Sequence, residues 1–130
     1  MTAFLADTHA LVWHLTDPGR LGRGARRAFD AADAGQWLCY VPVVGLVELS
    51  LLYERGGLRI GPSQVLEALS EHPGYAVLPL DLEQALAFGA FSSVRDPMDR
   101  LILAASRATR SRLVSRDARL DGHGIERLWE

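Results

Sequence analysis

Four carboxylates in four separate segments are the residues of this chain best suited to chemistry. Asp7 and Asp117 follow short apolar runs, Glu48 lies among apolar residues at helical spacing, and Asp99 follows an Asp-Pro pair. Carboxylates that converge repel one another and need a counter-cation to stay ionised. An all-oxygen set of ligands favours Mg²⁺ or Mn²⁺ over zinc. Such an ion can activate water against a phosphodiester, so the pattern indicates metal-dependent phosphodiester hydrolysis if the four acids meet.

Each of these acids also has a purely structural interpretation. Asp7 could cap the helix after it, Asp99 could belong to a capping arrangement at the start of its own helix, and Asp117 could brace a turn with Arg119. Glu48 is harder to explain in this way, because burying an unpaired carboxylate costs several kcal/mol. An arginine partner is its main structural alternative.

The elements that must position the acids alternate along the chain. Apolar runs bounded by turn residues predict strands at 3–7, 37–41, 75–80, 112–115 and 125–129. Helical spacing and capping residues predict helices at 8–15, 23–34, 43–55, 63–71, 82–91 and 97–110. This alternation predicts an α/β fold with a mostly parallel central sheet of four to five strands, flanked by helices on both faces.

The predicted sheet also predicts where the acids lie. Asp7 and Asp117 follow strands, and the working crevice of an open parallel sheet lies beyond the carboxyl ends of its strands. Glu48 lies one turn into the helix after the second strand. Pro97 at the first helical position would make Asp96 the N-cap and leave Asp99 inside the helix. We therefore expect Asp99 to carry the site role.

Composition narrows the class of protein. The 130 residues predict one domain, 1–130, and the net charge of −2 excludes a uniformly basic coat for nucleic acid. All 14 basic residues are arginine, so the chain has no lysine for catalysis. Cys39 is the single cysteine, no run approaches a membrane span, and the N-terminus lacks the features of a signal peptide. We expect a cytoplasmic protein.

The four acidic segments together resemble a known family. LADTHALVW, VVGLVELSLLYERGGL, DPMDRLILAAS and LVSRDARL are similar, in order and spacing, to the four acidic motifs of PIN domains, specifically the VapC-like toxins of bacterial toxin–antitoxin pairs. The resemblance spans nearly the whole chain and places the metal site on Asp7, Glu48, Asp99 and Asp117. It implies a metal-dependent endoribonuclease that is usually dimeric and held inactive by a small antitoxin.

Residues beside the acids are candidate contacts for the RNA substrate. Phosphates that approach an acidic metal site need a basic rim. Arg100 and Arg116 adjoin expected ligands and are the best candidates among the arginines of the C-terminal third. Thr8, His9 and Ser115 also adjoin the acids and complete the candidate substrate-binding set.

The predicted helix 43–55 suggests a surface that binds another protein chain. Residues 43–53 are apolar on almost every side, which one small sheet cannot cover, so we expect a homodimer with the antitoxin docking nearby. Trp13, Trp37 and Trp129 are expected to pack in the core or at its edge rather than to stack on bases.

Three rival functions place similar residues on similar folds. Response-regulator receivers and haloacid-dehalogenase-like phosphatases also hold Mg²⁺ at strand ends, but both use a lysine that this chain lacks. Asp7 also lacks the second Asp two residues later that the phosphatase motif requires. A catalytically degenerate PIN-fold module that binds RNA or protein is the non-enzymatic alternative. Its RNA binding would survive a chelator, whereas the activity of a nuclease would not.

Overall fold

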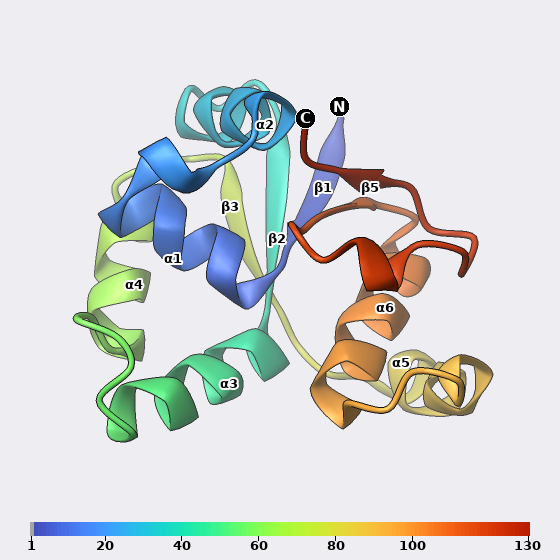
Figure 1. The fold of residues 1–130 in the computed structure, drawn as a ribbon. Helices are drawn as coiled ribbons and strands as arrows, with labels where there is room; N and C mark the ends of the chain where they lie inside the picture. The colour runs from blue at the N-terminus through green and yellow to red at the C-terminus, as the bar shows by residue number, and fades with distance from the viewer. Residues whose placement is uncertain (1) are drawn as a thin grey trace.

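A parallel sheet of five strands forms the centre of the molecule (Figure 1). The computed structural model describes residues 2–130. The strands, which lie in the order β3-β2-β1-β4-β5, are β1 (Ala3–Ala6), β2 (Leu38–Pro42), β3 (Tyr75–Leu78), β4 (Arg112–Val114) and β5 (Arg127–Leu128). All four neighbouring pairs are parallel. The predicted fold class is confirmed.

Helices connect the strands at the positions that the sequence predicts. They are α1 (Thr8–Thr16), α2 (Arg23–Asp33), α3 (Val43–Glu54), α4 (Pro62–Ser70), α5 (Leu82–Ala87) and α6 (Pro97–Thr109), with short 3₁₀ helices η1 (Pro18–Arg20), η2 (Phe88–Phe91) and η3 (Ala118–Leu120). Most boundaries lie within two residues of the prediction. One exception is the predicted helix 82–91, whose last turn is the 3₁₀ helix η2, and the other is segment 18–20, which forms a 3₁₀ helix where no helix was predicted.

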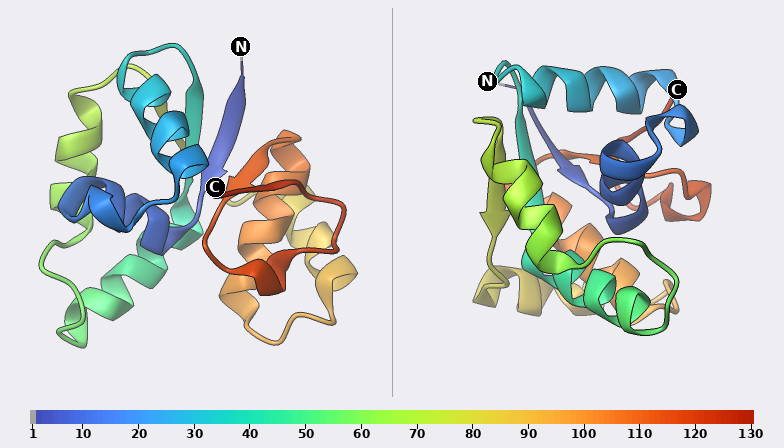
Figure 2. Two further views of the ribbon diagram at one scale, coloured as in Figure 1. Left: turned by 45° about the horizontal axis from the view of Figure 1, so that its top comes forward. Right: turned by 90° about the vertical axis from the view of Figure 1, so that its left-hand side faces the viewer.

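The two faces of the sheet carry separate apolar clusters. Phe4 and Ala6 of β1 pack in the cluster that includes buried residues of α1, α2 and α4. Leu5, between them, faces the opposite way and packs with α6 and η2. This alternation follows from the two-residue period of a strand. Figures 1 and 2 show the same arrangement, with α1, α2 and α4 on one side of the sheet and α5 and α6 on the other.

Helix α3 runs beside the carboxyl edge of the sheet, at the bottom of Figure 1. Its residue Val44 packs in one cluster and Leu49 in the other, which explains why the helix is apolar on more than one side. Its outer side remains uncovered, because Val47 is 54% exposed and Leu51 43% exposed. Within residues 2–130, no helix is both long and apolar enough to cross a membrane.

The strand order reverses at β1. The chain places β2 and β3 on one side of β1 and β4 and β5 on the other, so connections leave the carboxyl ends of β1 and β4 in different directions. Such a reversal opens a crevice at the edge of the sheet. Asp7 follows β1 at this place, and Ser115 follows β4.

Candidate active site

Asp7 is held at the reversal point by three hydrogen bonds. Its backbone N–H donates to the Val114 carbonyl at 3.0 Å, which continues the pairing of β1 with β4. Its Oδ1 accepts from the Thr8 N–H and its Oδ2 from the Ser115 hydroxyl, each at 2.8 Å. Burial raises the pKa of Asp7, while the bond from Ser115 opposes that shift. The capping interpretation is therefore correct, and it coexists with a place at the crevice.

The first turn of α6 separates the roles of two neighbouring acids. Pro97 occupies the first turn, and Asp96 is the N-cap, its Oδ1 accepting from the Met98 N–H at 2.9 Å. This arrangement is the predicted one. Asp99 lies in that same turn with its side chain partly buried, one turn before the fully buried Leu103.

Burial and neighbouring charges also perturb Asp99. Its pKa is raised from 3.8 to about 6, first by burial and then by neighbouring negative charges. Those charges belong to Asp96, Asp7, Glu48 and Asp117, in decreasing order of effect. Acids that are far apart in the sequence are thus close enough in the fold to act on one another.

Asp117 is oriented by an arginine two residues later. Arg119 donates from Nε to Oδ1 and from Nη2 to Oδ2, both at 2.9 Å. This bidentate bond is the main reason why the pKa of Asp117 is lowered. The Asp117 N–H also donates to the Ser115 hydroxyl at 3.1 Å, so Ser115 connects Asp117 with Asp7. The predicted brace with Arg119 is present, and the acid still faces the crevice.

Glu48 reaches the crevice from α3 because that helix packs closely on the start of α1. A side chain at Gly45 would place its Cβ 3.2 Å from the Thr8 hydroxyl, so glycine permits the approach. Glu48 is partly buried and forms no ion pair with any arginine among residues 2–130. The arginine-partner interpretation of Glu48 is not supported in that part of the chain.

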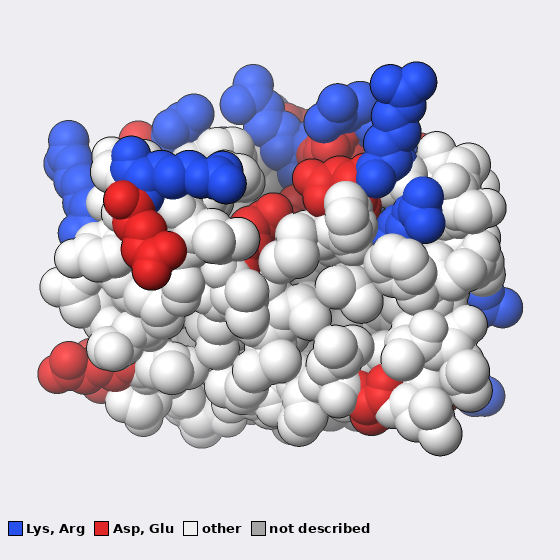
Figure 3. Space-filling view, turned by 90° about the horizontal axis from the view of Figure 1, so that it is seen from below, with Lys and Arg blue, Asp and Glu red and all other residues white. Residues whose placement is uncertain are grey.

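One hollow of about 500 Å³ brings most of the predicted site together. We call it the acidic hollow, and its lining consists of Asp7, His9, Ala10, Trp13, Glu48, Asp96, Asp99, Ser115, Arg116, Asp117, Ala118 and Arg119. Figure 3 shows acidic side chains gathered in a recess of the surface, with arginines beside them. All four predicted acids lie there, together with His9, Ser115 and Arg116.

Two predicted substrate contacts lie elsewhere. Arg100 donates from Nε to the Val94 carbonyl and from Nη2 to the Ser92 carbonyl, the latter at 3.0 Å. Its guanidinium also lies over the ring of Phe88, so it braces the loop before α6 instead of lining the acidic hollow. Thr8 is only 3% exposed and is covered by α3.

Five lining residues were not predicted as site residues, namely Ala10, Trp13, Asp96, Ala118 and Arg119. Trp13 follows His9 by four positions, and Asp96 precedes Asp99 by three, so each shares a helix face or turn with a predicted residue. This spacing from His9 and Asp99 is the sequence feature that could have placed Trp13 and Asp96 at the site.

The donor set fits a hard divalent cation in its chemistry. Carboxylate oxygens dominate the polar lining, and no cysteine thiolate is among the lining residues. In residues 2–130, no three His, Cys, Asp or Glu side chains surround one point closely enough to share an ion as they stand. The bonds of Asp7 to Ser115 and of Asp117 to Arg119 occupy oxygens that would serve as ligands.

Fold and site together define a class: a parallel α/β domain with a carboxylate site where its strand order reverses. The PIN domain family matches residues 4–125, and the chain belongs to that family. It is 34% identical over 126 residues to ribonuclease VapC22 of Mycobacterium tuberculosis, covering 95% of this chain and 93% of that protein.

Two solved structures from other bacteria share the fold. The chain resembles the structure of VapBC2 from Rickettsia felis bound to a promoter DNA fragment, with a TM-score of 0.72, 13% identity and coverage of 99% and 100% of the two chains. It also resembles a toxin–antitoxin complex from Klebsiella pneumoniae, with a TM-score of 0.60, 20% identity and coverage of 88% and 86%.

Proposed function

We propose that this chain is an endoribonuclease that hydrolyses RNA with Mg²⁺ or Mn²⁺ held by Asp7, Glu48, Asp99 and Asp117. The observation that carries the proposal is the convergence of acids from four distant segments on one hollow at the carboxyl edge of the sheet. The likeness to a ribonuclease over 95% of the chain supports RNA as the substrate. The cytoplasm is the proposed place of action.

The residues of the chain prepare the site in distinct ways. A bound Mg²⁺ or Mn²⁺ ion would supply water activation and stabilisation of charge on phosphate oxygens. Ser115 and the Thr8 N–H fix the two oxygens of Asp7. Mutual repulsion at Asp99 leaves the cluster in need of positive charge, which favours cation binding. Arg116, exposed at the rim, meets the incoming phosphates.

The test compares two helix caps. Asp7 and Asp81 each accept a backbone N–H at the start of a helix, and Asn preserves that role in both. Asp7→Asn should lower RNA cleavage by at least about a hundredfold, because the substitution removes a ligand charge. Asp81→Asn should cleave like the wild type. Cleavage should stop in chelator and return with Mg²⁺ or Mn²⁺, and undiminished activity of purified Asp7→Asn would overturn the proposal.

We further propose that the ribonuclease is the toxin of a toxin–antitoxin pair. The support is the likeness in fold to a toxin–antitoxin complex, together with the likeness in sequence to a VapC ribonuclease. Expression of the wild type alone should arrest growth, and Asp7→Asn should not. Co-expression of the cognate antitoxin should restore growth, and an antitoxin that neither binds the chain nor blocks its cleavage would contradict this proposal.

We propose that the chain forms a homodimer through a surface of α3 and α5 that has few charged side chains (Figure 3). Large apolar side chains are exposed on α3, on α5 and just before α5, and we call them the apolar face: Val47, Leu51, Leu80, Leu82 and Leu86. Figure 3 views the side of the molecule on which α3 and α5 lie, and most of that surface lacks charged side chains. Contiguous exposed apolar surface is typical of an interface. Light scattering at tens of micromolar should therefore give twice the mass of one chain.

A further inference from the structure

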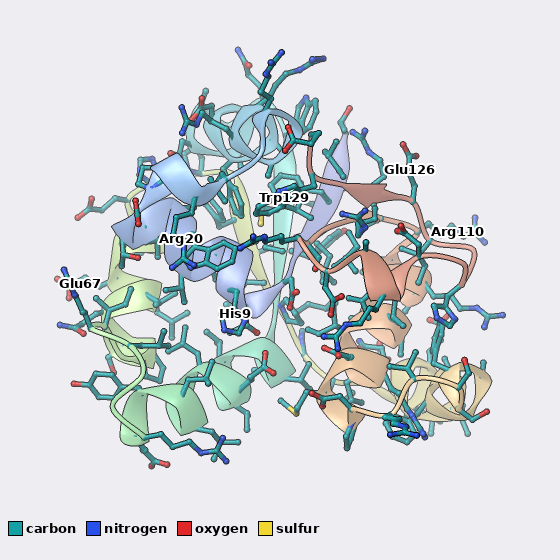
Figure 4. All side chains as sticks on the ribbon, in the orientation of Figure 1. His9, Arg20, Glu67, Arg110, Glu126 and Trp129 are labelled. Atoms are coloured by element: carbon teal, nitrogen blue, oxygen red, sulfur yellow. The ribbon has the colours of Figure 1, made fainter. Side chains whose placement is uncertain are left out.

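A second hollow adjoins the acidic hollow. It has a volume of about 630 Å³ and lies between α1, η1 and the segment that follows α3. We call it the arginine hollow, and its lining includes His9, Trp13, Arg20, Leu58 and Arg59. His9 and Trp13 line both hollows, so the two are adjacent across α1. The side chains of His9 and Arg20 both lie in front of α1 in Figure 4.

The Trp13 ring lies close to an arginine of each hollow. The Arg20 guanidinium carbon is 4.4 Å from the centre of the indole ring, and that of Arg116 is 5.9 Å from it. Trp129 packs edge-on against the same ring, with the ring centres 6.1 Å apart. Stacking of a guanidinium on an indole limits its motion while leaving its N–H groups available to a ligand. Trp13 is therefore placed to orient Arg20.

The arginine hollow carries an excess of positive charge. Neither Arg20 nor Arg59 takes part in an ion pair within residues 2–130, and the one acid in the lining is Asp17. The neighbouring acidic hollow has the opposite excess. The acids of the acidic hollow repel the phosphates that flank the one being cleaved. Binding of the neighbouring phosphate of the RNA strand therefore needs positive charge nearby. The arginine hollow provides that charge at the adjoining position.

We propose that the arginine hollow is a subsite for the phosphate next to the one that is cleaved, in a single strand of RNA. Arg20 and Arg59 bind this phosphate, and Trp13 is a positioning residue that holds Arg20. The inference rests on the proposed ribonuclease function and names how the substrate is aligned. The arginines bind the phosphate by its charge, so the subsite strengthens RNA binding without recognising the identity of the base.

The experiment measures cleavage of a short single-stranded RNA that spans a mapped cleavage site. Arg20→Ala/Arg59→Ala should raise KM by at least about tenfold, because charge-assisted bonds to phosphate are lost, while kcat stays within about twofold. The dependence of log KM on log salt should weaken by roughly 0.7 for a lost phosphate contact. Arg23→Ala/Arg27→Ala removes the same charge from a separate hollow beside α2 and should leave KM unchanged. Trp13→Ala should raise KM, and Trp13→Phe should restore it.

The possible results distinguish failure of the subsite proposal from failure of the proposed ribonuclease function. If the wild type neither cleaves nor binds RNA, both proposals are overturned. If the wild type cleaves but Arg20→Ala/Arg59→Ala keeps its KM and salt dependence, only the subsite is overturned. If this double variant cleaves normally and instead resists the antitoxin, the hollow binds a protein segment and the subsite proposal is again overturned. Unchanged circular dichroism would establish that the variants fold, as expected for two exposed arginines.

Discussion

Replacing Asp99 by Asn should make the metal-free protein more stable at neutral pH. Raising the pKa of this acid from 3.8 to about 6 corresponds to about 3 kcal/mol against the folded state when the group is ionised. The side chain is partly exposed, so solvent screening lowers the expected gain to about 1–2 kcal/mol. Asn has nearly the same shape and removes the charge that the cluster disfavours.

Because the pKa of Asp99 is raised in the folded state, the direction in which stability changes with pH can be predicted. Asp99 keeps its proton more readily in the folded state than in the unfolded state, so the free energy of unfolding falls as pH rises between about 4 and 6. Asp99→Asn lacks this titration. The two proteins should therefore be about equally stable below about pH 4, and the gap should open to about 1–2 kcal/mol by about pH 7.

Urea unfolding at a series of pH values in chelator measures this gap. Glu83→Gln is the matched control, because Glu83 lies in the first turn of α5 just as Asp99 lies in that of α6, but outside the acidic hollow. The control should be neutral or slightly destabilised, since an acid near a helix N-terminus is normally favourable. Added Mg²⁺ should stabilise the wild type more than Asp99→Asn. A variant that is less stable than the wild type at pH 7, with no convergence at low pH, would refute the electrostatic argument.

Three further predictions concern other parts of the site and the surface. Asp96→Ser should keep its helix cap and most cleavage activity, whereas Asp99→Ser should lower kcat by at least about a hundredfold; reversed phenotypes would move the metal role to Asp96. Ser115→Ala should weaken Mg²⁺ affinity about tenfold, read from the Mg²⁺ dependence of cleavage, because Asp7 loses an orienting bond; an unchanged Mg²⁺ dependence would contradict this role. Leu86→Glu should convert a dimer into a monomer by light scattering without changing the circular dichroism, and a wild type that is already monomeric would rule out the interface.

The sequence alone determined the elements and the register of the acids within them. Helical and strand periodicity predicted every strand of the sheet and every α-helix of the layers that cover it. Burial of an apolar face leaves such a local pattern in the sequence. The Asp96-Pro97 pair predicted the helix cap, and with it the placement of Asp99, because proline fits only the first turn. Strand 75–80 was predicted too long, since Pro79 cannot donate a bond to the neighbouring strand and β3 ends at Leu78.

Only the tertiary structure decided which side chains share the site. Arg100 adjoins Asp99 in the sequence, yet its guanidinium binds the carbonyls of its own preceding loop. Trp13 bears no motif, yet it lines both the acidic and the arginine hollow and lies close to an arginine of each. The partner of a long polar side chain depends on which distant backbone and ring atoms packing brings within reach. That choice leaves no periodic trace in the sequence, whereas the burial that builds the sheet and its helices does.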